Sequence, residues 1–103
     1  MSIGPSVAQS IGGVPIRLTD ERWQHIVEGH DDLASYRQDV LRVIEQPEAV
    51  FEGRGGSLIA VRSYGSRGTL AVFYREVGRD DGFMITARFL TGKPRTKKLW
   101  PRT

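Results

Sequence analysis

Two histidines, His25 and His30, are the side chains of this sequence best suited to transfer a proton near neutral pH. Helical spacing places His25 on the side of a predicted helix away from an apolar stripe that contains Trp23 and Ile26. We therefore expect His25 to be exposed, where it could act as a general acid or base or could simply lie on the surface. His30 follows Gly29 at the end of that helix, where it could equally form a polar link between two helices.

The sequence does not predict a metal or cofactor site. The five-residue spacing of the two histidines is unlike the i, i+4 pair of zinc hydrolases, and the chain contains no cysteine. The acidic pairs at 31–32 and 80–81 occur where helix caps and turns favour aspartate. The sequence also contains neither a Gly-Lys-Ser phosphate loop nor a Gly-x-Ser-x-Gly nucleophile motif. We expect chemistry that needs no cofactor and no metal ion.

The charged residues are divided unevenly between the two halves of the chain. The net charge is +3, but residues 1–52 carry four arginines against nine acidic residues, a net charge of −5. Residues 53–103 carry eleven lysines and arginines against three acidic residues, a net charge of +8. An anionic partner such as a nucleic acid would bind the basic half, although a solvated surface with a chance bias would give the same numbers.

The residues around the histidines predict two short helices. Thr19 is a good N-cap for a helix over 20–28, and the apolar spacing predicts a second helix over 33–45. A short strand over 14–18 precedes them, and Pro15 would confine this strand to the edge of a sheet.

Beyond residue 50 the apolar pattern changes to a period of two, which is typical of strands. It predicts an antiparallel meander with strands over 57–63, 69–76 and 83–90, and 49–54 is a candidate for a further strand. Helices followed by strands indicate an α+β domain in which the helix pair packs on one face of the sheet.

Alternation along these strands predicts that one face of the sheet is basic. We expect that face to collect Arg62, Arg75, Thr86 and Arg88, with Met84 and Leu90 on the same side as Thr86. The C-terminal stretch adds Lys93, Arg95, Lys97 and Lys98. The alternative role for the three arginines is ion pairing with Glu52, Glu76 or Asp81.

A histidine on a polar helix face, together with arginines and a threonine on a sheet, suits cleavage of RNA without a metal ion. In that reaction the 2′-hydroxyl attacks the adjacent phosphorus, which requires a base, an acid and cations for the developing charge. Many basic surfaces bind RNA without cleaving it, so these residue types alone do not distinguish a ribonuclease from a binding module.

Three segments of the chain carry a resemblance to a known family. They are Leu18-Thr-Asp-Glu-Arg-Trp-Gln-His-Ile-Val-Glu-Gly-His30, Gln46-Pro-Glu48 and Met84-Ile-Thr-Ala-Arg-Phe89. Over roughly residues 16–94 the chain resembles the phage and bacterial nuclease-like domains grouped with barnase, EndoU, certain colicins and RelE. The resemblance implies a RelE-like or barnase-like α+β fold, with a short edge strand and two helices packed on the antiparallel meander. It also implies a metal-independent ribonuclease, often a toxin beside a small antitoxin.

The resemblance also implies the residues of a site. His25 and His30 match the two motif histidines, Thr86 matches the strand threonine, and Arg88 lies in the same motif at a variable position. Family members often carry His-Pro-Glu at the second histidine, whereas this chain has His30-Asp31-Asp32. The predicted catalytic residues are His25, His30, Thr86 and Arg88, and the predicted RNA-binding residues are Arg62, Arg75, Lys93, Arg95, Lys97 and Lys98.

Two functions from different classes remain open on the sequence. The first is a ribonuclease toxin that acts on RNA such as tRNA or mRNA and is bound by a small acidic antitoxin. The second is a non-catalytic module that binds RNA or protein with the same basic face. We expect a flexible leader over 1–15, the nuclease-like domain over 16–94 and a basic tail over 95–103. The sequence holds neither an apolar run of membrane-spanning length nor a secretory signal pattern, so we expect a cytoplasmic protein.

Overall fold

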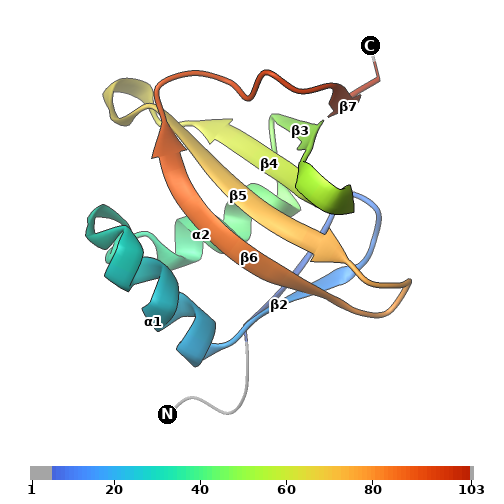
Figure 1. Cartoon of the computed structure of the whole chain (residues 1–103), viewed down its shortest axis with the longest axis horizontal. Helices are drawn as coiled ribbons and strands as arrows, with labels where there is room; N and C mark the ends of the chain where they lie inside the picture. Colours follow the sequence, from blue (N-terminus) through green and yellow to red (C-terminus); the bar gives the residue numbers. More distant parts are fainter. Residues whose placement is uncertain (1–5, 103) are drawn as a thin grey trace.

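A seven-stranded sheet forms the centre of the computed structural model, which describes residues 6–102 (Figure 1). Its strands lie in the order β1-β2-β6-β5-β4-β3-β7. Every neighbouring pair is antiparallel except β2 and β6, which are parallel. The α+β fold class and the central antiparallel meander are therefore confirmed. The strands are β1 (Ser6–Gln9), β2 (Pro15–Leu18), β3 (Ala49–Glu52), β4 (Leu58–Ser63), β5 (Thr69–Glu76), β6 (Gly82–Leu90) and β7 (Lys98–Trp100).

Two α-helices connect β2 to β3. The first, α1 (Asp20–Gly29), begins as predicted, because the Thr19 side chain accepts a hydrogen bond of 3.0 Å from the backbone N–H of Arg22. The second, α2 (Arg37–Glu45), starts later than predicted, after a single 3-10 turn called η1 (Asp31–Leu33). Leu33 in this turn is fully buried, so tertiary packing there outweighs the helical spacing of the sequence.

Both helices pack on the same face of the sheet, which we call the inner face. Figure 1 shows α2 behind the strands and α1 alongside β6. The main core lies between the helices and the sheet and includes Ile26 of α1, Val43 of α2 and Tyr74 of β5. The opposite side, the outer face, carries a smaller apolar cluster formed by Ala49, Phe51, Ile59, Val61 and Ala71, with Phe73 and Leu90 packed against it.

A bulge interrupts β6 at Ile85. Phe73 pairs with Thr86 while its neighbour Tyr74 pairs with Met84, so Ile85 is the extra residue. The bulge reverses the alternation at this point, and Met84 is buried in the inner core rather than sharing the side of Thr86. The expectation for Met84 was therefore wrong, because a single inserted residue moves every preceding side chain to the other face.

The ends of the described chain also join the sheet. β1 lies within the segment expected as a leader, and β7 lies within the expected basic tail; residues 1–5 and 103 are outside the described part. β2 pairs with β1 on one side and with β6 on the other, so it is not an edge strand, contrary to expectation. Pro15 is tolerated there as its first residue. Within residues 6–102, no helix has the length and apolar character needed to cross a membrane.

Candidate nucleic-acid interface

The register of β5 and β6 brings Arg75, Thr86 and Arg88 to the outer face. Residues paired directly across an antiparallel ladder point to the same side of the sheet. Arg88 pairs with Ala71, which lies in the outer cluster, Thr86 pairs with Phe73, and Arg75 lies two residues beyond Phe73 on the same strand. The structure thus confirms that these three side chains share one face.

Arg62 does not share that face, contrary to expectation. It pairs with Leu70, whose side chain is in the inner core. Its Nη1 donates a hydrogen bond of 2.6 Å to the carbonyl oxygen of Gln46, the residue that ends α2. Arg62 therefore caps the C-terminus of α2, where a positive charge interacts favourably with the helix dipole. Alternation within each strand could not reveal this, because the face depends on the register between strands.

The ion pairs considered for the three arginines do not form among the described residues. Asp81 instead pairs with Arg17, which donates hydrogen bonds of 2.8 and 3.1 Å to its two carboxylate oxygens. These hydrogen bonds hold the pKa of Asp81 below its usual value. Glu76 accepts a 2.6 Å hydrogen bond from the Ser10 hydroxyl. Arg75 and Arg88 have no carboxylate partner in residues 6–102.

Arg75 and Arg88 are both held against other groups. The guanidinium of Arg88 lies over the Phe73 ring, 5.4 Å from its centroid, in a cation–π contact. The guanidinium of Arg75 lies beside the turn formed by Gly55 and Gly56, where a Cβ would sit 3.5 and 3.6 Å from its nitrogens. These contacts position the two guanidinium groups and leave them able to bind an anion.

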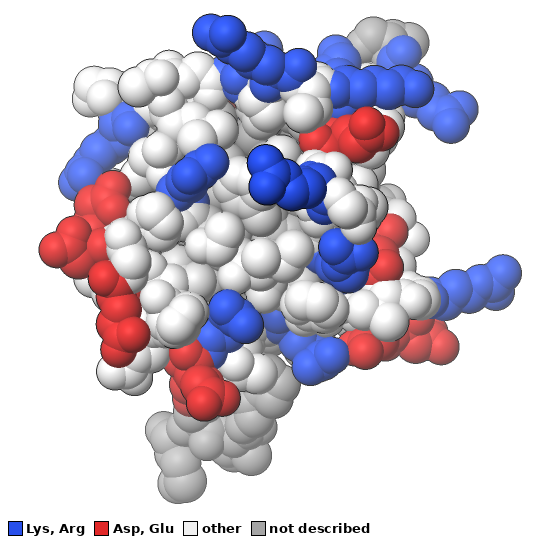
Figure 2. Space-filling model, viewed as in Figure 1, with Lys and Arg blue, Asp and Glu red and all other residues white. Residues whose placement is uncertain are grey.

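The predicted basic stretch lies next to this face. Lys98 in β7 pairs with Phe51, an outer-cluster residue, so Lys98 faces outward. Lys93, Arg95 and Lys97 are exposed in the connection from β6 to β7, which crosses one end of the sheet in Figure 1. Figure 2, seen from the outer side, shows Lys and Arg spread across the surface while Asp and Glu lie towards its margins, notably along α1 and η1.

His25 is exposed, as predicted, with 74% of its side chain accessible. Its Nδ1 lies 4.0 Å from Oε1 of Glu28, one helical turn away. An open hollow of about 420 Å³ runs beside it along α1, lined by Thr19, Glu21, Arg22, Gln24, His25 and Glu28.

A second hollow lies next to this one. It measures about 330 Å³ and is lined by Arg17, Thr19, Arg22, Phe83 and Met84. Thr19 and Arg22 line both hollows, so the two hollows are neighbours, and we call the pair the α1–β6 groove. Phe83 pairs with Arg75 and lies on the outer face. His25 thus lines one hollow of this groove, and Phe83 of the outer face lines the other.

Arg22 joins α1 to the bulge of β6. Its Nη1 donates to the carbonyl oxygen of Ile85 at 3.5 Å. Neither Arg22 nor Arg17 was among the predicted site residues. The i, i+3 spacing of Arg22 and His25 could have indicated a shared helix face, but the contact with β6 joins residues 63 apart in sequence.

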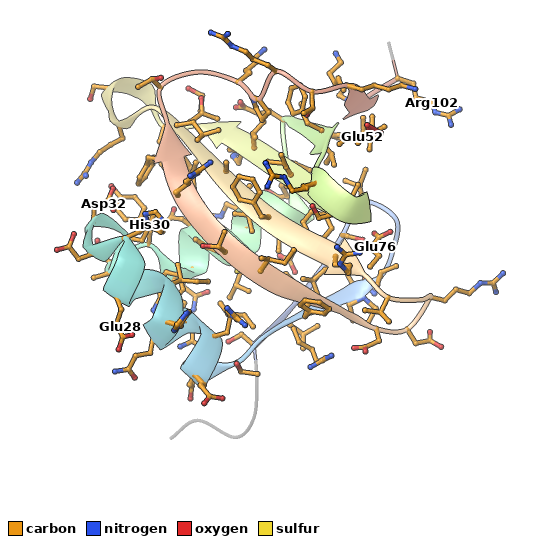
Figure 3. All side chains as sticks on the ribbon, viewed as in Figure 1. Glu28, His30, Asp32, Glu52, Glu76 and Arg102 are labelled. Carbon is orange, nitrogen blue, oxygen red and sulfur yellow. The ribbon has the colours of Figure 1, made fainter. Side chains whose placement is uncertain are left out.

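His30 is not brought to this groove. Figure 3 shows it where α1 meets η1, near Asp32. Its backbone N–H donates to the carbonyl oxygens of Ile26 and Val27, and its carbonyl oxygen accepts from Leu33. His30 follows the last residue of α1 and lines neither hollow of the groove. The described contacts of His30 are those of a residue that links two helices.

Within residues 6–102, no three His, Asp or Glu side chains are grouped closely enough to hold a metal ion. Comparisons with protein-family models, with curated proteins and with solved structures found no match to this chain.

Proposed function

We propose that the protein binds RNA on the outer face of its sheet. The observation that carries this proposal is that Arg75 and Arg88 point outward without a carboxylate partner in the described chain. The strand acids Glu52 and Glu76 lie towards the margin of the sheet in Figure 3, and Glu76 accepts a hydrogen bond from the Ser10 hydroxyl. A face with several unpaired cations next to a basic segment is suited to a polyanion, because each neutralised phosphate releases counterions.

Binding of a fluorescently labelled RNA at two ionic strengths tests this proposal. We expect affinity to fall steeply with salt, and Arg88→Gln to weaken binding and reduce the salt slope by about one. Arg62→Gln is the matched control, since it removes the same charge from the inner side and should leave the slope unchanged. Binding that is absent at low salt, or equally sensitive to both substitutions, would contradict an RNA interface on the outer face.

We further propose that the protein cleaves the bound RNA as a metal-independent ribonuclease. The supporting observation is the α1–β6 groove, in which Arg22 lines both hollows, His25 lines one and Phe83 of the outer face lines the other. His25 would either remove the 2′-hydroxyl proton or donate a proton to the leaving 5′-oxygen. The 2′-oxygen attacks phosphorus and the bond to the 5′-oxygen breaks, leaving a 2′,3′-cyclic phosphate and a 5′-hydroxyl. Arg22 would stabilise the developing charge on the phosphoryl oxygens, and Thr86 and Arg88 would position the strand.

Incubation of the purified protein with total RNA in EDTA tests cleavage. Discrete fragments ending in cyclic phosphate are expected. Intact RNA that is nevertheless bound would instead support the non-catalytic module, an alternative favoured by the openness around His25 and the absence of His30 from the groove.

We also propose that the protein is a toxin with a RelE-like or barnase-like fold. Two helices packed on one face of an antiparallel sheet support a RelE-like or barnase-like arrangement, and a basic outer face would suit a small acidic antitoxin. The protein would then be a cytoplasmic toxin. Co-expression with candidate acidic proteins encoded beside it, followed by a cleavage assay, tests that role: an antitoxin should bind the outer face and suppress cleavage.

A further inference from the structure

We infer that the outer face selects single-stranded RNA by stacking bases on Phe73, Phe83 and the guanidinium of Arg88. This inference rests on the proposed RNA binding and names the form of RNA that the face accepts. It requires aromatic rings on the basic face, partial exposure of those rings, and a cation able to lie flat against a base.

The two phenylalanines lie on the outer face of neighbouring strands. Phe73 of β5 is opposite Thr86, and Phe83 of β6 is opposite Arg75, two residues along β5 from Phe73. Both side chains are partly exposed, although phenylalanines are usually buried. They are therefore close neighbours on one sheet surface, and the cation of Arg75 lies on that surface beside Gly55 and Gly56.

Arg88 completes the arrangement. Its guanidinium lies over the Phe73 ring at 5.4 Å, and the residue itself is exposed. The planar guanidinium beside this ring could stack on a nucleobase, while its N–H groups reach a phosphate. A lysine could supply the charge but not the flat surface.

Stacking distinguishes single strands from duplexes. Bases in a duplex are already stacked and hidden from the protein, whereas bases of a single strand are free to lie on aromatic side chains. An acidic protein would be attracted by the same cations but would not depend on the aromatic rings. The partly exposed rings therefore favour single-stranded RNA over duplex RNA or an acidic protein surface.

The test uses the full chain carrying His25→Ala, so that RNA stays intact, and compares a short unstructured RNA with its duplex at one salt concentration. We expect tighter binding to the single strand. Phe73→Leu and Phe83→Leu should each weaken single-strand binding by about 5- to 150-fold, with no change in duplex affinity or in salt slope. Phe73→Tyr should keep the wild-type affinity, and Arg88→Lys should keep the salt slope while losing preference for the single strand.

Phe89→Leu is the matched control, because it makes the same change on β6, the strand of Phe83, at a ring that packs inward against Tyr36 and Tyr64. Melting curves establish that each variant is folded. Equal affinity for single strand and duplex, or unchanged binding by Phe73→Leu, would overturn stacking while leaving RNA binding intact. Competition by polyglutamate as strong as that by RNA would make the face an acidic-protein surface and would also overturn it. Absence of all RNA binding would overturn the proposed function itself.

Discussion

Nη1 of Arg22 lies 3.5 Å from the carbonyl oxygen of Ile85, the residue that the bulge inserts into β6. This contact connects the first turn of α1 to the strand that carries Thr86 and Arg88. β2 pairs with β6 only at Gly82 and Phe83, so the edge of β6 beyond Phe83 is not covered by β2. That short pairing leaves room for a helix residue to reach the edge of β6.

The first prediction concerns the two histidines. His25→Ala should reduce RNA cleavage by about 10²–10⁴-fold, because a general acid or base is lost. RNA affinity and melting temperature should stay nearly unchanged, since the side chain is 74% exposed. Single-turnover cleavage in EDTA with protein in excess over RNA measures the chemical step apart from binding.

His30→Ala is the comparison for this experiment. Its ring does not line the α1–β6 groove, so cleavage should persist in His30→Ala even if the melting temperature changes. Equal loss of cleavage in both variants would place His30 in the site, in line with the family resemblance and against the groove described above. Unchanged cleavage in His25→Ala would remove His25 from the mechanism.

The second prediction concerns Arg22 as a group that contacts the reacting phosphate. Arg22→Gln keeps a side chain compatible with the helix but removes the cation. Loss of a donor that stabilises transition-state charge typically costs about 10²–10³-fold in rate, so cleavage should fall more than RNA affinity does. Arg42→Gln, an exposed substitution on α2, should change neither rate nor affinity. A fall in affinity that accounts for the whole loss would make Arg22 a binding residue only.

The sequence predicted those features that depend on neighbours along the chain. The Thr19 cap, the start of α1 and the spans of β4, β5 and β6 agree with the structure to within one residue. The shared side of Thr86 and Arg88 also follows from their i, i+2 spacing. Each of these signals lies within a few residues of what it predicts.

Features that depend on pairing between distant segments could not be predicted from the sequence. Arg62 was assigned to the wrong face because its side is set by register with Leu70, and the bulge at Ile85 shows only when β5 is laid beside β6. β1 and β7 contain four and three residues, too few for a clear period of two. The approach of Arg22 to β6 joins residues distant in sequence, which no local pattern encodes.

The third prediction concerns Gly82, where β2, β5 and β6 come together. A Cβ at this position would lie 2.6 Å from Cδ1 of Ile16 and 2.7 Å from the carbonyl oxygen of Arg75. Both distances are too short, and one neighbour is backbone, so Gly82→Ala should lower the free energy of unfolding by about 1–3 kcal/mol. Gly78→Ala is the matched control, because nothing lies within 4 Å of its Cβ position. Chemical denaturation of both variants measures the difference, and equal stabilities would contradict the packing described here.

Two tyrosines give the protein a predictable response to alkaline pH. Burial, together with a 2.8 Å hydrogen bond to Asp39, raises the pKa of Tyr64 from 10.0 to about 12. Burial also raises the pKa of Tyr74, whose hydroxyl is buried without a hydrogen-bond partner among the described residues. Folding thus favours the neutral form of both phenols, so their contribution to stability is complete below pH 10 and is lost as the pH rises towards 12.

The fourth prediction separates these two tyrosines by replacing each with phenylalanine. Tyr64→Phe removes the hydrogen bond to Asp39 and should lower the free energy of unfolding at neutral pH by about 1 kcal/mol. Tyr74→Phe removes an unpaired hydroxyl from the core, so neutral-pH stability should be unchanged or should increase. Both variants should lose stability less steeply than the wild type between pH 10 and 12, because one phenol no longer binds its proton more tightly in the folded state. Denaturation midpoints across that range provide the measurement. A large loss of stability at neutral pH in Tyr74→Phe would mean that its hydroxyl has a partner, such as a buried water, and that the core is more polar there than described.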